Sequence, residues 1–498
     1  MREREAKLGA GPAFALPDLD GVIDGATATA LPPRNLDAVY YDTPDLRLAR
    51  WGITVRHRTG EDDGWTVKLP EDGDRGPALV RNELTFPGAR AAGPPPPVTD
   101  LVRAHVRSST FRPVARLRTR RTPVELRDEQ GRRLAEVVDD EVSVYEGRRV
   151  AARFREVEIE LAEDASAALL DRVVQRLTNA GAGRPDPTPK LVRALGWKAT
   201  RPPEPAPGEL RDDATVSAVV RETLVAAVTR ILRHDPGVRL GDDPEDVHQA
   251  RVGTRRLRSD LRTFRSVIDP EWLSATSGEL KWLGAVLGDV RDADVLFERL
   301  QRQASELSTR DARATAALLR RLTVQRDEAR LTLLAALRGE RYAALLDRLV
   351  AATETVPVIA GDDKPAHDAL PELVRKPWNH LKQAVESLDA DPPDDALHQV
   401  RIRAKRARYA AEAAAPLVGK PARAFAKAVA DLQTVLGDHQ DAVVAEEWLR
   451  REGARSASVA LGAGQLIARQ QAEAAATRER WPSMWTRASA KKLRAWFT

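Results

Sequence analysis

The sequence predicts an α+β protein of two domains, a mainly β half followed by an all-α half. Runs that alternate in period two fill residues 1–197, whereas Ala-, Leu- and Arg-rich runs with helical spacing fill residues 210–498. The stretch between them, residues 198–209, is rich in proline and has no periodicity, which is typical of a linker. A chain of 498 residues is also too long for one ordinary core.

The first half contains short runs broken by Gly, Pro and Asp, as expected for strands. They are AVYYDT (38–43), GITVRHR (52–58), GWTVKLP (64–70), VARLRTR (114–120), RRLAEVVDDEVSVY (132–145) and FREVEIELA (154–162). Two stretches in this half have helical character, residues 99–108 and residues 164–181. The second of these begins at an Asp and ends at a Gly, which are a start and a stop signal for a helix.

Composition excludes several classes of chemistry. The chain has no cysteine, so a disulfide framework, a thiolate metal site and a cysteine nucleophile are impossible. Its formal net charge is only +5 despite 79 basic residues, so local clusters of charge matter more than the total. No apolar run of 18 residues is present, and we therefore expect a cytoplasmic protein.

Several predicted strands place charged residues opposite an apolar face. In residues 155–161, three glutamates alternate with Val157, Ile159 and Leu161. Arginines alternate in the same way in residues 56–58 and 116–120. For one strand, a solvent-facing charged side is the better interpretation, but five such strands favour a closed sheet with a polar interior.

The charges suggest what this interior binds. Carboxylates are hard oxygen ligands of the kind that Mg²⁺ or Mn²⁺ accepts, and the candidates for the metal site are Glu3, Glu5, Asp139, Glu158 and Glu160. Basic side chains would hold phosphate oxygens, and the candidates are Lys7, Arg56, Arg58, Lys68, Arg81, Arg116, Arg118 and Lys190, the last reaching the interior from a loop. Such a site favours phosphoryl transfer to water by positioning and charge neutralisation.

The N-terminal residues Glu3 to Lys7 match the E-x-E-x-K signature of the CYTH domain, also called the triphosphate tunnel fold. YYDTPDLRLARWGITVRHRTG, GWTVKLP, RNELTF, ARLRTRR, LAEVVDD and REVEIEL follow in the order of that family. The resemblance covers residues 1–197 and implies an antiparallel β tunnel, a divalent metal and a triphosphate-bearing substrate. It also implies that Glu3, Glu5 and Lys7 are catalytic. Asp139 is adjacent to Asp140, and a shift of one residue would reverse the face.

The second half contains an internal repeat. Residues 247–264 match residues 397–414, and residues 283–295 match residues 432–444. The separation from His248 to Asp289 is 41 positions and that from His398 to Asp438 is 40. Two matched blocks in the same order predict a duplicated helical bundle.

Each copy carries a basic stripe beside an apolar seam. Spacings of three and four place the stripe along one side of a helix, at the edge of the face that packs into the bundle. The stripes and their basic neighbours are His248, Arg251, Arg255, Arg256, Arg258 and Arg262 in the first copy, and His398, Arg401, Lys405, Arg406 and Arg408 in the second. The candidate partners of the stripes are four aspartates, Asp289, Asp292, Asp438 and Asp441, and an extended polyanion. We expect both, with the aspartates holding some arginines in place for the polyanion.

These paired blocks resemble the CHAD domain, a duplicated helical bundle, over residues 210–490. The resemblance implies that inorganic polyphosphate binds along the basic helices. The copies differ at Arg291 against Gln440 and at Arg262 against Glu412, so the second stripe is expected to bind less strongly.

Two functions of different classes follow. The first is a metal-dependent triphosphatase that cleaves inorganic triphosphate, with a bundle that binds polyphosphate. The second is a non-catalytic polyphosphate-binding protein. The CYTH family also contains thiamine triphosphatases and adenylate cyclases, but aromatic residues are only 5% of this chain, which disfavours a thiamine pocket. No G-x-x-x-x-G-K-[ST] loop and no H-E-x-x-H motif is present, and we expect neither a membrane nor a specific nucleic-acid sequence as partner.

Overall fold

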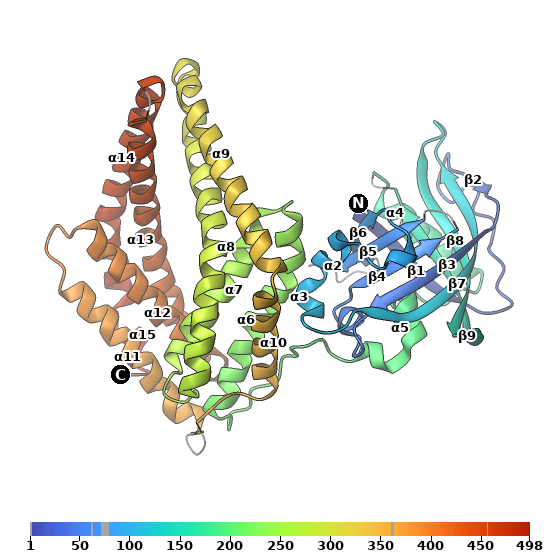
Figure 1. Cartoon of the computed structure of the whole chain (residues 1–498), viewed down its shortest axis with the longest axis horizontal. Coiled ribbons are helices and arrows are strands. Elements are labelled where there is room, and N and C mark those ends of the chain that lie inside the picture. Colours follow the sequence, from blue (N-terminus) through green and yellow to red (C-terminus); the bar gives the residue numbers. More distant parts are fainter. Residues whose placement is uncertain (1, 61–62, 71–78, 163, 360–362, 456) are drawn as a thin grey trace. The chain divides into compact units, whose positions relative to one another are not determined.

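The computed structural model describes residues 2–60, 63–70, 79–162, 164–359, 363–455 and 457–498. The chain forms two compact units, Met1–Glu204 and Pro205–Thr498. The first is built mainly of strands and the second of helices (Figure 1), which confirms the predicted α+β class.

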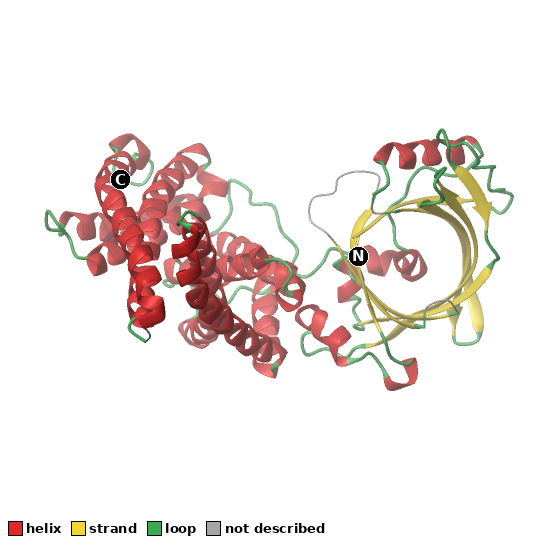
Figure 2. Cartoon of the chain, turned by 90° about the horizontal axis from the view of Figure 1, so that it is seen from above, coloured by secondary structure: helices red, strands yellow, loops and turns green. Residues whose placement is uncertain are grey.

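An antiparallel sheet forms the body of the first unit. Its strands are β1 (Arg2–Ala10), β2 (Thr27–Ala30), β3 (Arg34–Asp42), β4 (Thr54–Thr59), β5 (Gly64–Pro70), β6 (Leu79–Phe86), β7 (Arg112–Arg127), β8 (Arg133–Glu146) and β9 (Arg149–Leu161). Their order is β2-β7-β3-β4-β5-β6-β1-β9-β8, and a further pairing of β7 with β8 closes the sheet into a ring, with β2 attached at β7. Figure 2 shows this ring of strands end on.

Short helices cover the outside of the ring or enter it. They are α1 (Arg47–Arg50), α2 (Pro96–Leu101), α3 (Arg103–Val106), α4 (Ala167–Asn179) and α5 (Lys190–Leu195), with short 3-10 turns at Arg90–Ala92 and Gly196–Thr200. The predicted helix over 99–108 is therefore two short helices, and the first of them begins at Pro96, in a run of prolines at 94–97.

Alternate side chains of β9 point to the outside and to the inside of the ring. Val157 and Ile159 pack on Leu169, Val173 and other buried side chains of α4 and β8, so they form a core outside the ring. The glutamates of the same strand then point into the ring, as expected for a period of two. The polar interior follows directly from this arrangement.

One end of the interior is apolar. Ala38, Leu117, Val142 and Val144 from three strands pack there against Leu191 of α5. The helix closes this end and places Lys190, its first residue, beside the polar part of the interior. Lys190 is thus the start of a helix and not the loop residue that we expected.

Asp42 determines the local fold after β3. Its fully buried carboxylate accepts hydrogen bonds from the backbone N–H groups of Leu48 and Ala49 at 2.9 Å, and it satisfies donors of α1 that would otherwise lack partners. Burial raises the pKa of Asp42, although these hydrogen bonds oppose the rise. The chain can therefore turn sharply from β3 through α1 to β4, the strand that carries Arg56 and Arg58.

The second unit consists of helices. They are α6 (Val216–Leu240), α7 (Pro244–Thr263), α8 (Pro270–Ser305), α9 (Thr309–Arg338), α10 (Glu340–Glu354), α11 (Ala366–Glu386), α12 (Asp394–Val418), α13 (Lys420–Gly453), α14 (Ala457–Ala488) and α15 (Lys491–Arg494). None of the helices in the described part of the chain has the length and apolar content needed to cross a membrane.

The repeat corresponds to two helical hairpins, α7 with α8 and α12 with α13. Both predicted seams are buried, Val247, Ala250, Leu257, Leu261 and Phe264 on α7, and Leu397, Val400, Ala404, Ala407 and Ala411 on α12. Because α7 also contacts α12, the two basic stripes lie on neighbouring helices.

Candidate functional site

The polar part of the ring encloses a cavity of about 540 Å³. Its walls combine basic and acidic side chains from most of the strands and from α5, with Tyr40 as the aromatic contribution of the described residues. The basic ones are Lys7, Arg34, Arg56, Arg58, Lys68, Arg81, Arg121, Arg133 and Lys190, and the acidic ones are Glu5, Glu83, Glu125, Glu136, Glu158 and Glu160. This composition suits a small, strongly charged anion together with a cation.

Three of the carboxylates form a cluster that could hold a metal ion. Glu5, Glu158 and Glu160 each offer one oxygen, and these oxygens lie within 4.8 Å of one another. The residues come from the paired strands β1 and β9, where Glu5 stands opposite Glu160. Three convergent oxygen donors fit a hard divalent cation, so this part of the predicted metal set can act together.

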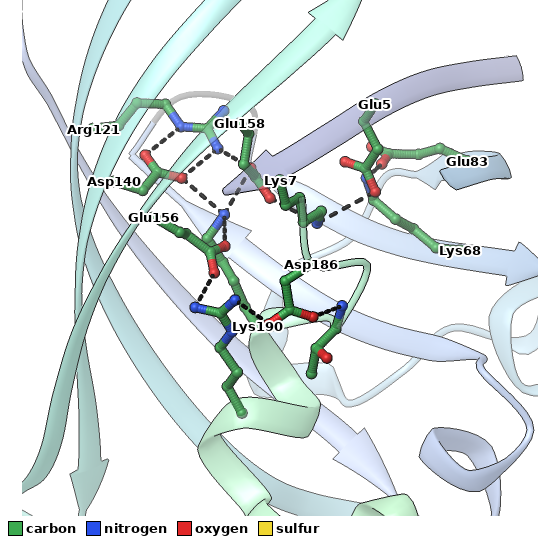
Figure 3. Close-up of polar contacts among 12 residues, drawn as sticks. Glu5, Lys7, Lys68, Glu83, Arg121, Asp140, Glu156, Glu158, Asp186 and Lys190 are labelled. Carbon is green, nitrogen blue, oxygen red and sulfur yellow. Dashed lines mark hydrogen bonds and ion pairs between the residues drawn. The ribbon is translucent and has the colours of Figure 1, made fainter. Parts of the chain in front are cut away.

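Basic side chains hold Glu158 in its charged form. Its carboxylate lies 2.6 Å from Lys7 Nζ, 2.7 Å from Lys190 Nζ and 3.1 Å from a guanidinium nitrogen of Arg121 (Figure 3). Burial alone would raise its pKa, but Lys190, Lys7 and Arg121 lower it well below the usual range. Glu158 is therefore an anion near neutral pH.

The other two members of the cluster differ from Glu158. Burial raises the pKa of Glu160, and its nearest charges only partly oppose the rise. Burial also acts to raise the pKa of Glu5, but Lys7, whose ammonium group is 3.3 Å away, together with Lys68 and Arg81 outweighs it and lowers the pKa. The site therefore combines carboxylates with opposite shifts.

A buried ion network lies behind Glu158. Lys190 Nζ contacts Asp140 at 2.9 Å and Glu156 at 3.0 Å, and Arg121 donates two hydrogen bonds to Asp140 at 2.8 and 3.0 Å (Figure 3). Lys190 and Arg121 are thus fixed by carboxylates on one side and face the cavity on the other. Such support limits the movement of the groups that contact a ligand.

The opposite wall carries the predicted phosphate ligands of β4 to β6. Arg56, Arg58, Lys68 and Arg81 all line the cavity, and Lys68 Nζ lies 2.5 Å from Glu83. The Nε of Arg56 is buried and has no hydrogen-bond partner among the described residues. A buried donor without a partner is costly, so this guanidinium is suited to an anion from outside the chain.

Two predicted phosphate ligands lie elsewhere. Arg116 and Arg118 face the outside of the ring, where both bind Asp37, Arg116 at 2.5 and 2.9 Å and Arg118 at 3.1 Å. The sequence R-x-R-x-R cannot show which face of β7 is internal, and the internal side is in fact that of Leu117 and Arg121. The expected tunnel role of Arg116 and Arg118 is therefore wrong.

The expected role of Asp139 as a metal ligand is also wrong. Its carboxylate accepts two hydrogen bonds from Arg155 at 2.5 and 2.8 Å, on the face opposite Asp140. Asp140 is the fully buried residue of the internal network. The side chain of Glu3 lies outside the described residues.

The predicted site residues do not include Arg121 and Glu83. They also omit Glu156, which shares a strand face with Glu158, and Asp140, the alternative to Asp139. Glu83 follows Arg81 by two positions in RNELTF, so its place on the internal face could have been inferred. Arg121 and Asp140 each adjoin a residue of like charge, and only the pairing of Arg121 with Asp140 in the sheet decides which one points inward.

A second concentration of charge lies between the two repeats of the helical unit. The charges of Arg255, Arg401 and Arg251 all act on Lys405, which makes no ion pair within the described residues. Burial, together with these charges, lowers the pKa of Lys405 to about 7. Arg251 binds one predicted partner, Asp292, at 3.0 Å. Four cations from α7 and α12 thus lie together with little compensation from carboxylates.

The glycine of the L-G-D motif in each repeat lies beside an arginine of the stripe. A side-chain carbon at Gly288 would lie 3.6 Å from the guanidinium of Arg251, and one at Gly437 would lie 3.6 Å from that of Arg401. This is an ordinary van der Waals distance, so each guanidinium lies against the next helix of its hairpin at the position of the glycine. The repetition indicates that both arginines are held in equivalent places.

The remaining stripe residues differ in their surroundings. Arg256 and Arg408 both bind Glu412, so their charge is partly neutralised. The others lie along the same helices without an ion pair among the described residues, His248, Arg258, Arg262, His398 and Arg406. The aspartates Asp438 and Asp441 interact electrostatically with Arg401, and burial raises the pKa of both.

Comparisons with known proteins cover both units. A CYTH domain model matches residues 1–190, and a CHAD domain model matches residues 222–450. An uncharacterized protein of Mycobacterium tuberculosis is 35% identical over 475 residues, which span 90% of this chain and 88% of the relative. Among solved structures, PptA from Streptomyces chartreusis is 26% identical and covers 55% of this chain and 100% of its own (TM-score 0.47). The CHAD domain of the plant Ricinus communis is 28% identical and covers 57% and 97% (TM-score 0.47).

Proposed function

Because the chain belongs to the family in which a CYTH domain is followed by a CHAD domain, we propose that its tunnel is a divalent-metal-dependent hydrolase of inorganic triphosphate. The observation that carries the proposal is the joint presence of the Glu5, Glu158 and Glu160 cluster and a basic wall in one cavity. A protein that only bound polyanions would gain nothing from buried carboxylates that repel them, unless a cation lies between.

The metal site would consist of Glu5, Glu158 and Glu160, and Mg²⁺ or Mn²⁺ suits their oxygen donors. The chemistry that such a cation supplies when bound is charge neutralisation and polarisation of a phosphoryl group. Lys7 bridges Glu5 and Glu158 and thereby adjoins both the metal ligands and the cavity.

The basic wall would bind and orient the substrate. Arg56, Arg58, Lys68 and Arg81 line one side of the cavity, and Arg121 and Lys190 line the other, so a chain of phosphate groups between them would be contacted from two sides. Each charge-assisted hydrogen bond contributes about 1.5–3 kcal/mol. The small aromatic contribution to the wall favours inorganic triphosphate over a thiamine or nucleotide ester.

The helical unit is proposed to bind inorganic polyphosphate. The support is the cluster of Arg251, Arg255, Arg401 and Lys405. Burial, together with the charges of the three arginines, lowers the pKa of Lys405, and a bound anion would relieve the repulsion among these cations. Guanidinium groups match phosphate oxygens geometrically, and two neighbouring helices provide an extended row of them.

Phosphate release from triphosphate, pyrophosphate, ATP and long-chain polyphosphate would test the tunnel, with Mg²⁺ or Mn²⁺ and with a chelator. We expect the highest turnover with triphosphate and none with the chelator. Equal turnover of all four substrates, or turnover that the chelator does not change, would contradict the proposal. Binding of polyphosphate in the chelator without hydrolysis under any condition would favour the non-catalytic alternative.

A further inference from the structure

The two copies of the repeat are not equivalent where they face each other. Arg255 of the first copy and Lys405 of the second occupy the same position of the repeat. Arg255 donates a hydrogen bond from Nε to the hydroxyl group of Tyr409 at 3.1 Å. Four positions after Arg255, the residue equivalent to Tyr409 is Ser259, whose buried hydroxyl has no hydrogen-bond partner in the described part of the chain.

Tyr409 is itself held firmly. Its side chain is only 2% exposed, and the guanidinium groups of Arg256 and Arg408 lie over its ring at 5.3 and 5.5 Å from the ring centre. Both arginines also bind Glu412, which connects them into one network around the ring. Two cations over an aromatic ring, with a shared carboxylate, restrict the movement of the ring.

The tyrosine therefore stands between two sets of arginines. The arginines that contact its ring are compensated by Glu412. The arginine that contacts its hydroxyl belongs to the cluster with Arg251, Arg401 and Lys405, in which Arg251 pairs with Asp292 and the other three have no ion pair among the described residues. The hydrogen bond takes only Nε of Arg255 and leaves the two terminal nitrogens to bind phosphate oxygens. A guanidinium held through Nε loses less conformational freedom when an anion binds.

We propose that Tyr409 is a positioning residue for anion binding by the helical unit, which holds the guanidinium of Arg255 in the orientation that contacts a phosphate chain. The inference rests on the proposed binding of polyphosphate and adds a residue outside both basic stripes. It also assigns different tasks to the two copies, since Arg255 is fixed in advance and Lys405 has no equivalent support.

A double-mutant cycle in the full chain tests the proposal, with the dissociation constant for long-chain polyphosphate measured in a chelator. The variants are Tyr409→Phe, Arg255→Ala and the two combined. Tyr409→Phe keeps the ring and removes the hydroxyl, and we expect it to weaken binding about three- to tenfold. In the Arg255→Ala background the same change should have no further effect, because the group that Tyr409 positions is gone.

The matched control is Tyr342→Phe. Tyr342 is also buried, and its hydroxyl donates a hydrogen bond to Asp235 at 2.9 Å on the pairing of α10 with α6, and not to a residue of the stripes. This variant should lower the melting temperature and leave the affinity for polyphosphate unchanged.

The outcomes separate the two claims. Affinity that depends on Arg255 but not on Tyr409, or a Tyr409→Phe effect of equal size in the Arg255→Ala background, would overturn the positioning role alone. Affinity that Arg255→Ala does not change would overturn the role of the stripe in polyphosphate binding and the inference with it.

Discussion

Glu158→Gln and Glu160→Gln should both weaken metal-dependent turnover at limiting metal, yet they should change stability in different ways. Each substitution keeps the size of the side chain and removes one charge. Glu158 contacts Lys7, Lys190 and Arg121, whereas burial raises the pKa of Glu160, which shows that the fold disfavours its charged form. Glu158→Gln therefore removes a carboxylate partner from three buried cations. Glu160→Gln instead removes a charge whose burial is unfavourable.

The magnitude follows from the contacts. Removing one partner of a buried ion pair costs about 3–5 kcal/mol, and we take the lower limit because Lys7 keeps Glu5 while Lys190 and Arg121 keep Asp140. For a unit of this size, about 3 kcal/mol corresponds to a fall of about 6–12 °C in melting temperature. Glu160→Gln should change the melting temperature by less than about 3 °C or raise it.

Differential scanning calorimetry of the full chain in a chelator measures the melting temperature of each variant. Phosphate release at limiting Mg²⁺ measures its apparent affinity for the metal. Glu141→Gln is the control, because Glu141 is exposed, lies on the outer face and pairs only weakly with Arg120 at 3.4 Å. We expect both cavity variants to lose at least about tenfold in apparent metal affinity. Equal destabilisation by the two variants, or a Glu158→Gln enzyme with unchanged metal dependence, would refute the reasoning.

Three further predictions concern the basic residues. Arg58→Ala should lower kcat/KM for triphosphate by about ten- to a hundredfold, whereas Arg118→Ala, on the outer face, should leave it unchanged. Steady-state kinetics of the two variants measures this difference. Combined Arg251→Ala and Arg401→Ala should reduce the slope of log affinity for polyphosphate against log salt by about 1–2, and an unchanged slope in a salt titration would exclude phosphate contacts. Because the pKa of Lys405 is about 7, its ammonium form is lost above that value, so polyphosphate affinity should fall as pH rises from 6 to about 8, and a pH titration of Lys405→Arg should lack this fall.

The alternation of side chains with a period of two predicts most of the tunnel lining, because one side of β9 is apolar and the other is charged. Val157 and Ile159 had to face a core, so Glu158 and Glu160 had to face the interior, and the structure places them there. The repeat likewise determined the helical seams, since Leu257 and Leu397 could be identified from spacing alone.

The sequence does not show which face of a strand points into the ring where both faces carry charge. In β7 an arginine stands at each of positions 116, 118, 120 and 121, so alternation alone cannot separate inside from outside. The pairing of Arg121 with Asp140 across β7 and β8 resolves this choice, and it depends on the closure of the ring and not on local sequence. The same limit applies to Asp139 and Asp140, because two adjacent aspartates do not show which of them points inward.

The repeat shows that contacts between its two copies are also difficult to predict from the sequence. Each copy keeps an arginine beside a glycine, Arg251 at Gly288 and Arg401 at Gly437, and this conserved geometry could be anticipated from matched blocks. The change from Arg262 to Glu412 was visible as well, but its consequence was not, because Glu412 binds Arg256 of the other copy. A carboxylate that lowers the charge of its own stripe thus also stabilises the contact between α7 and α12. Glu412 reduces the positive charge available to an anion only at Arg256 and Arg408. It has no ion pair in the described part of the chain with the other cluster residues, Arg251, Arg255, Arg401 and Lys405.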